Sequence, residues 1–113
     1  MKQRHDSIDV RGVHFTIEWV PDLRDENGEK LDGVTFGAQH LIRICADLHT
    51  ARRIRTLVHE YVHAVCYVTG FANILNDDLE EILAQSMEYG IMQLVPQLGR
   101  EILKVATEHT EGK

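Results

Sequence analysis

TLVHEYVHA, residues 56–64, is the stretch that decides the fold. It carries an HExxH motif, His59 to His63, inside a largely apolar segment, residues 50–69, whose spacing predicts a helix. Residues four apart on a helix leave the same face, so the two imidazoles can hold one zinc ion. Glu60 lies at the flank of that site, where it can take a proton from a zinc-bound water instead of binding the metal.

The residues around the motif support a metal site over two histidines that share a helix face by chance. Thr56 precedes His59 by three positions, and the pairs Tyr61-Val62 and Ala64-Val65 are uncharged. A charge at any of these positions would be hard to bury beside a metal in a packed helix.

Length and composition indicate one soluble domain, residues 1–113. The net charge of −6 argues against a nucleic-acid binder. No apolar run approaches the ~20 residues that span a bilayer, and the N-terminus lacks the apolar core of a signal peptide. We therefore expect a cytoplasmic protein without nucleic-acid or membrane partners, and a monomer.

The two cysteines, Cys45 and Cys66, are too few for a disulfide framework and are expected to be free thiols. Cys66 follows His63 by three positions and shares its helix face, so it is an alternative metal ligand. A small buried cysteine is the commoner role for such a residue.

Alternation of apolar and polar residues predicts about three strands near the N-terminus. The clearest covers residues 13–19, and two more are expected at residues 34–36 and 41–45. Arg11-Gly12 is expected to form a bulge or turn, and residues 21–33 an acidic loop.

A second helix is expected to start at residues 76–78 and to run to about Leu94, where Pro96 breaks it and starts a third. The fold class is thus α+β, with a small antiparallel or mixed sheet packed on a helical core. That core comprises the HExxH helix, a second helix that carries a metal ligand, and a C-terminal helix.

A catalytic zinc needs a third protein ligand and an open position. The candidates are the acids that open the second helix, Asp77, Asp78, Glu80 and Glu81. We choose Glu81, which lies 18 residues after His63, because Ala84 at +3 allows close helix approach and Gln85 at +4 can hydrogen-bond the site. Glu80 is the alternative, and either glutamate could instead serve in a capping box.

The segments TLVHEYVHA (56–64) and LEEI (79–82) together resemble the small phage-encoded zinc metallopeptidases, which are similar to the minimal gluzincin domains of the ImmA/IrrE group. The stretch from Glu81 to Gln85 is similar to the ExxA(N/D) element that supplies the third ligand in that group, with Gln85 replacing the usual Asn or Asp. The resemblance spans roughly residues 33–95 and implies a zincin-like fold with an edge strand near residues 39–44.

Both the residues and the resemblance imply a zinc-dependent metallopeptidase that acts on a protein or peptide. Its ligands would be His59, His63 and Glu81, with Glu60 assisting the attack of zinc-bound water on a peptide bond. Residues 41–45 could hold an extended substrate by backbone pairing if they form a sheet edge, and the equal alternative is a plain core strand. The candidates for stabilising the oxyanion are Tyr89, His40 and His49.

Two other classes of function compete with a peptidase. One is a catalytically dormant zincin-fold module that docks onto a host protein, for which the acidic loop at residues 22–32 would suit a basic partner. The intact Glu60 argues against it, because a structural zinc site has no use for a general base. The other is an enzyme that uses Cys66 as nucleophile, but no cationic neighbour or helix N-terminus lowers the pKa of that thiol.

Overall fold

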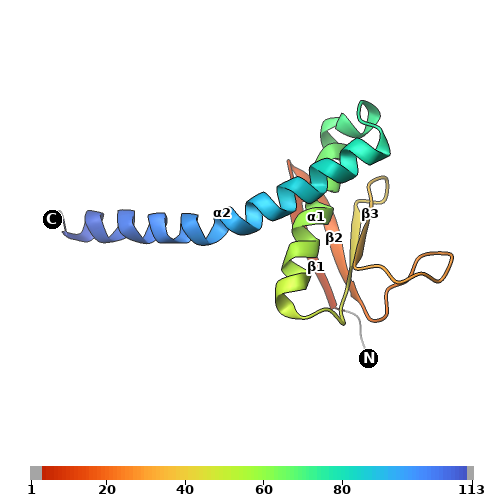
Figure 1. Ribbon diagram of the computed structural model, residues 1–113, viewed down its shortest axis with the longest axis horizontal. Helices are drawn as coiled ribbons and strands as arrows, with labels where there is room; N and C mark the ends of the chain where they lie inside the picture. Colours follow the sequence, from red (N-terminus) through yellow and green to blue (C-terminus); the bar gives the residue numbers. More distant parts are fainter. Residues whose placement is uncertain (1–3, 112–113) are drawn as a thin grey trace.

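The computed structural model describes residues 4–111, with side chains described over residues 6–105. A four-stranded mixed sheet at the N-terminus packs against two long helices, so the predicted α+β class is confirmed (Figure 1). The strands are β1 (Arg4–Val10), β2 (Val13–Val20), β3 (Gly33–Phe36) and β4 (Leu41–Cys45); the helices are α1 (Thr50–Thr69), the short 3-10 helix η1 (Phe71–Asn73) and α2 (Asp77–Glu111).

The first two strands form a hairpin around Arg11 and Gly12, both with positive φ, at 50° and 88°. A two-residue turn with positive φ at both positions matches the twist of the flanking strands. The expected turn is therefore present, but it joins β2 to an additional strand, β1, so the sheet has four strands instead of about three. The β1 residues Ile8 and Val10 alternate toward the core as those of β2 do.

The order of the strands is β1-β2-β4-β3, with β2 and β4 parallel and the other pairs antiparallel. Of the two alternatives for residues 41–45, the sheet edge that the resemblance implies is wrong and the core strand is confirmed, because β4 lies between β2 and β3. Its residues Ile42 and Ile44 are fully buried, which a central strand requires. The edge beside the helices is β3, which the chain reaches only after the loop that follows β2.

Helix α1 covers one face of the sheet. The main core joins the inward side chains of β1, β2 and β4 to the inner face of α1, with Ala64 fully buried. The helix begins after His49, whose ring accepts a hydrogen bond from the Arg52 backbone, and ends at Gly70, whose φ of 85° suits a glycine cap. These bounds agree with those that the sequence predicted.

Helix α2 starts at Asp77. Asn76 caps its N-terminus, because Oδ1 of Asn76 accepts a hydrogen bond from the Leu79 backbone N–H at 2.8 Å. Its first turns pack on α1, where Ala84 is fully buried against Val62 and Cys66. This is the close helix approach that a small residue at position 84 predicts.

The expected break at Pro96 is wrong, because α2 runs through it to Glu111 as one helix. A proline inside a helix usually kinks it, and Figure 1 shows α2 changing direction along its length. Gln97 donates a side-chain hydrogen bond to the Gln93 carbonyl on the turn that the proline disturbs. Beyond that turn the helix extends away from the sheet, and the molecule measures 60 × 40 × 24 Å.

Among the described residues, no helix combines the length and the apolar character needed to cross a bilayer.

Candidate metal centre

The two motif histidines lie side by side on α1. The ring centroids of His59 and His63 are 5.0 Å apart, and the rings meet at 63°. Both side chains are mostly buried, and they lie between β3 and the first turns of α2. The i, i+4 spacing therefore places the two Nε2 atoms near each other on the same side of α1.

Glu81 completes the group from α2. Its Oε1 lies 2.8 Å from Nε2 of His59, and its Oε2 lies 3.1 Å from Nε2 of His63. Ligand atoms at 2.0–2.1 Å from a tetrahedral zinc would be about 3.3 Å from one another, close to these separations. The ligand atoms of the three residues lie within 4.8 Å of one another, so His59, His63 and Glu81 could hold a metal ion.

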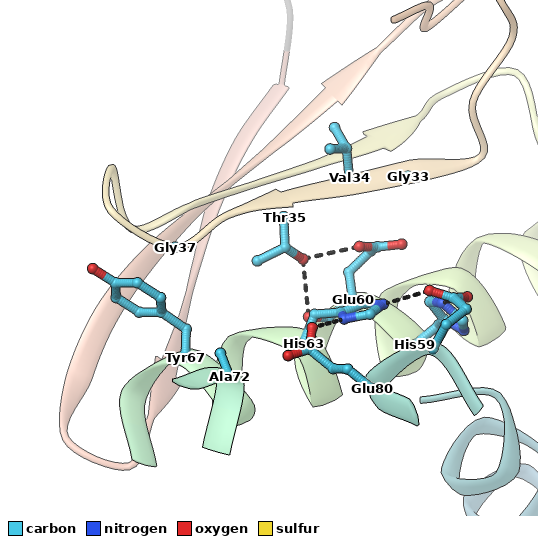
Figure 2. Close-up of a pocket in the computed structure, with 11 residues that line it drawn as sticks. Gly33, Val34, Thr35, Gly37, His59, Glu60, His63, Tyr67, Ala72 and Glu80 are labelled. Atoms are coloured by element: carbon cyan, nitrogen blue, oxygen red, sulfur yellow. Dashed lines mark hydrogen bonds and ion pairs between the residues drawn. The ribbon is translucent and has the colours of Figure 1, made fainter. Parts of the chain in front are cut away.

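A carboxylate orients each histidine from the other side of its ring. Nδ1–H of His63 donates to Oε2 of Glu80 at 2.6 Å (Figure 2). Nδ1–H of His59 donates in the same way to Oε1 of Glu88 at 3.0 Å. A hydrogen bond at Nδ1 fixes the tautomer and leaves the Nε2 lone pair free for a ligand. Nε2 of each imidazole faces Glu81, which is the orientation that two histidine ligands of one metal would need.

These contacts separate the alternatives for the third ligand. Glu80, the runner-up, faces Nδ1 of His63 and not the point where the two Nε2 atoms meet. Asp77 and Asp78 are exposed and do not belong to the group. Glu81 is the acid of this turn that reaches both Nε2 atoms, so its role as third ligand stays a prediction that this geometry allows.

Gln85 was predicted to hydrogen-bond the candidate metal site, and Glu88 was not predicted to take part. Gln85 is exposed and lines a cavity next to the site, whereas Glu88 contacts His59 directly. The available signal was helical spacing, because Glu88 follows Glu81 by seven residues, two turns along the same face.

Glu60 is buried, with 7 % of its surface exposed, and β3 holds it in place. Oγ1 of Thr35 lies 2.9 Å from Oε1 of Glu60 and 3.0 Å from its backbone carbonyl oxygen (Figure 2). Gly33 permits the close approach of the strand, because a Cβ there would lie 2.7 Å from Cγ2 of Thr56 and 3.0 Å from Cγ of Glu60. The carboxylate is therefore fixed beside the histidines by the edge strand.

Burial raises the pKa of Glu60, and the charge of Glu81 adds to this, although the Thr35 hydrogen bond and the two histidines oppose it. Burial lowers the pKa of His63, but the hydrogen bond to Glu80 and the charges of Glu60 and Glu81 outweigh burial, so that pKa lies above its usual value. Four carboxylates thus surround two imidazoles, which favours a bound cation at this point.

Two cavities meet at the site. The first, of about 450 Å³, follows β3 toward the C-terminal end of α1 and is lined by Thr35, Gly37 and Tyr67 in addition to the motif residues. The second, of about 590 Å³, extends toward the N-terminal end of α1. They share Gly33, His59 and Glu60. The candidate metal centre therefore lies in the middle of a cleft that follows the edge strand.

Of the three oxyanion candidates, Tyr89 lines the second cavity, but His40 and His49 line neither cavity. His40 stacks near Phe15 with ring centroids 5.2 Å apart, and His49 caps α1. Tyr67, which was not among the predicted candidates, lines the first cavity. Tyr67 and Tyr89 thus flank the centre from opposite ends.

Both cysteines are free and buried, as expected. Cys66 packs between α1 and α2 and is not part of the group that could hold a metal, so the ligand alternative is not supported. Burial raises the pKa of its thiol, which disfavours the thiolate that a nucleophile needs.

Comparisons of this chain with known protein families, with curated proteins and with solved structures found no match.

Proposed function

We propose that the protein is a zinc-dependent peptidase in which His59, His63 and Glu81 hold the metal and Glu60 is the general base. The observation that carries the proposal is the position of Glu60. Its carboxylate is buried beside both histidines, is held by Thr35, and is separate from the group that could bind a metal. A zinc site that only stabilises a fold is closed by four ligands and has no use for such a group.

The donor atoms favour zinc among the common metals. Two imidazole nitrogens and one carboxylate are ligands of the kinds that zinc, a borderline-soft cation, binds in proteins. Three protein ligands would leave the fourth position of a tetrahedral zinc for water or substrate. Bound there, zinc would supply a nucleophile from water at neutral pH and would polarise a carbonyl oxygen.

The protein's own groups move the proton. Glu60 accepts it from the attacking water and later delivers it to the leaving amine, so that one carboxylate acts first as base and then as acid. Thr35 holds Oε1 of Glu60, and Oε2 forms no hydrogen bond within the described part of the chain, so Oε2 is free for the transfer. A raised pKa brings the carboxyl group closer to the pH at which such an exchange works best.

The edge strand offers a means of holding an extended peptide. Within residues 4–111, no strand pairs with the side of β3 that faces away from β4, and residues of β3 line the cleft. A peptide could add to this edge by backbone hydrogen bonds. Gly37 lets the Tyr67 ring lie against the end of this strand, because a Cβ at Gly37 would overlap that ring.

Glu60→Gln tests the proposal because the amide keeps the shape and the acceptor for Thr35 but cannot take the proton. Metal-loaded wild type should cleave members of a randomised peptide mixture, and Glu60→Gln should keep its metal while losing cleavage by orders of magnitude. Glu29→Gln, the same change at an exposed loop position, is the matched control.

Full activity of Glu60→Gln would exclude hydrolysis as the function. It would favour the alternative in which the domain acts by docking to another protein.

A further inference from the structure

The second cavity has a charge pattern that the proposed chemistry does not use. Its lining includes three cations, Lys30, Arg52 and Arg55. They lie at the end of the cleft where α1 begins. The first cavity has no lysine or arginine in its lining. The two ends of the cleft therefore differ in charge.

Arg52 is already paired. Its Nε and Nη2 atoms donate to Oδ2 of Asp32 at 2.9 and 2.6 Å. The two glutamates of this cavity are also engaged, since Glu60 accepts from Thr35 and Glu88 from His59. The charge of Arg52 is therefore already balanced by Asp32.

Arg55 is different. It is partly buried and forms no hydrogen bond or ion pair with any residue that the structure describes. Lys30, at the exposed rim, also has no side-chain partner in this part of the chain. A guanidinium held in a cavity has five donors in a fixed fork, which matches a carboxylate.

Arg55 lies where a peptide bound along β3 would pass after the metal site. It precedes His59 by one helical turn on the same face of α1. Antiparallel pairing, the more stable arrangement per residue, would direct a peptide on β3 from Gly37 toward Gly33. The part of the peptide that follows the metal would then enter the second cavity.

We propose that Arg55, with Lys30 at the rim, binds a carboxylate of the substrate on the C-terminal side of the cleaved bond. The substrates would then be acidic peptides, recognised by an Asp or Glu side chain or by the carboxylate of the chain end. This inference rests on the proposed function, because it assigns a substrate class to the same site.

The experiment uses the full metal-loaded chain and a mixture of synthetic decapeptides randomised at every position. Cleavage products identified by mass spectrometry should show Asp or Glu, or the free chain end, after the cleaved bond. Matched peptides are then compared with Glu or Gln at the preferred position, each with a free or an amidated C-terminus. A difference between the Glu and Gln peptides would assign the recognised carboxylate to a side chain. A difference between the free and the amidated peptides would assign it to the chain end.

Arg55→Leu should lower kcat/KM for the carboxylate-bearing peptide on the order of 10- to 100-fold, the range of a charge-assisted hydrogen bond, and should lower it far less for the neutral peptide. Arg55→Glu should shift the preference toward a peptide with Lys at that position. Arg100→Leu, which removes the same charge from an exposed part of α2 that lines neither cavity, should change neither value. Metal content measured for each variant checks that the site is intact.

Cleavage without a preference for the carboxylate, or an equal loss for both peptides in Arg55→Leu, would overturn the inference and leave the proposed function standing. If Arg55 only balanced the charges of Glu60 and Glu88, Arg55→Leu should lower kcat/KM equally for both peptides.

If the wild type cleaves no peptide, the proposed function fails, and binding of fluorescent versions of the matched peptides replaces the kinetic readout. Tighter binding of the carboxylate-bearing peptide that Arg55→Leu abolishes would still support an acidic-peptide site. Equal binding of both peptides would reject it.

Discussion

Nδ1 of His59 lies 3.0 Å from Oε1 of Glu88, although the two residues are 29 positions apart and belong to different helices. Each side chain is only 16 % exposed. The contact orients the His59 ring so that its Nε2 faces Glu81. Glu80 does the same for His63, so α2 supplies one candidate ligand and two carboxylates that orient the other ligands.

Glu88→Ala should weaken zinc binding about 10- to 100-fold, the usual effect of removing a group that orients a histidine ligand. Competition with a chromogenic chelator measures this affinity. Glu101→Ala, on the exposed part of α2, is the control and should bind zinc as the wild type does. Equal affinities of Glu88→Ala and the wild type would mean that the ring is oriented without the carboxylate.

The two neighbouring glutamates should have different effects. Glu81→Ala removes a ligand and should reduce zinc affinity more than Glu80→Ala, which removes only the partner of His63 Nδ1. The same chelator competition ranks the two variants. The reverse order would assign the third ligand to Glu80.

The helical part of the site was predictable because its spacing is local. His59, Glu60 and His63 occupy one face of α1 by helix geometry, and Glu81 follows from an acidic first turn on the next helix. Thr35 could not be identified in this way. It reaches Glu60 only because β3 is the sheet edge next to α1, and strand order is a non-local property.

Two errors about the fold have the same origin. Alternation identified residues 41–45 as a strand but could not show that β4 pairs in parallel with β2 and is therefore central. Pro96 is a strong local signal for a helix end. It is overridden in a long helix whose turn around Pro96 is exposed, so that water can bond the carbonyl group that the proline leaves without its N–H partner.

Glu60→Gln should raise the melting temperature of the metal-free protein at neutral pH. Burial raises the folded-state pKa of Glu60, so the folded protein bears the cost of a buried charge at every pH above that pKa. The unfolded chain titrates near the ordinary value of 4.5. As the pH falls through the raised folded-state pKa toward that value, both states become protonated and the advantage of the amide should disappear.

Calorimetry across this pH range measures the difference between the two proteins, and Glu29→Gln at the exposed loop is the control. A lower melting temperature for Glu60→Gln at neutral pH would show that the carboxylate stabilises the folded state through its contacts with Thr35 and the histidines.

Chelation should lower the melting temperature of the zinc-loaded protein. The metal would link α1 to α2, and the unfolded chain has no preformed site, so zinc at 100 times its Kd should stabilise by about 2.7 kcal/mol. His63→Ala should melt at the same temperature with and without chelator. An unchanged wild-type melt after verified removal of zinc would indicate that the apolar contacts of Ala84, Val62 and Cys66 already hold the helices.

The metal content of the protein tests the central claim most directly. The zinc content per chain should be measured by elemental mass spectrometry. The samples are protein purified without added metal, the same protein loaded with zinc and freed of the excess, and His63→Ala treated in the same two ways. We predict close to one zinc ion per chain in the loaded wild type and a large loss in His63→Ala, because one of the two imidazole ligands is missing. A wild-type chain that carries no transition metal and cannot be loaded with zinc would contradict the account.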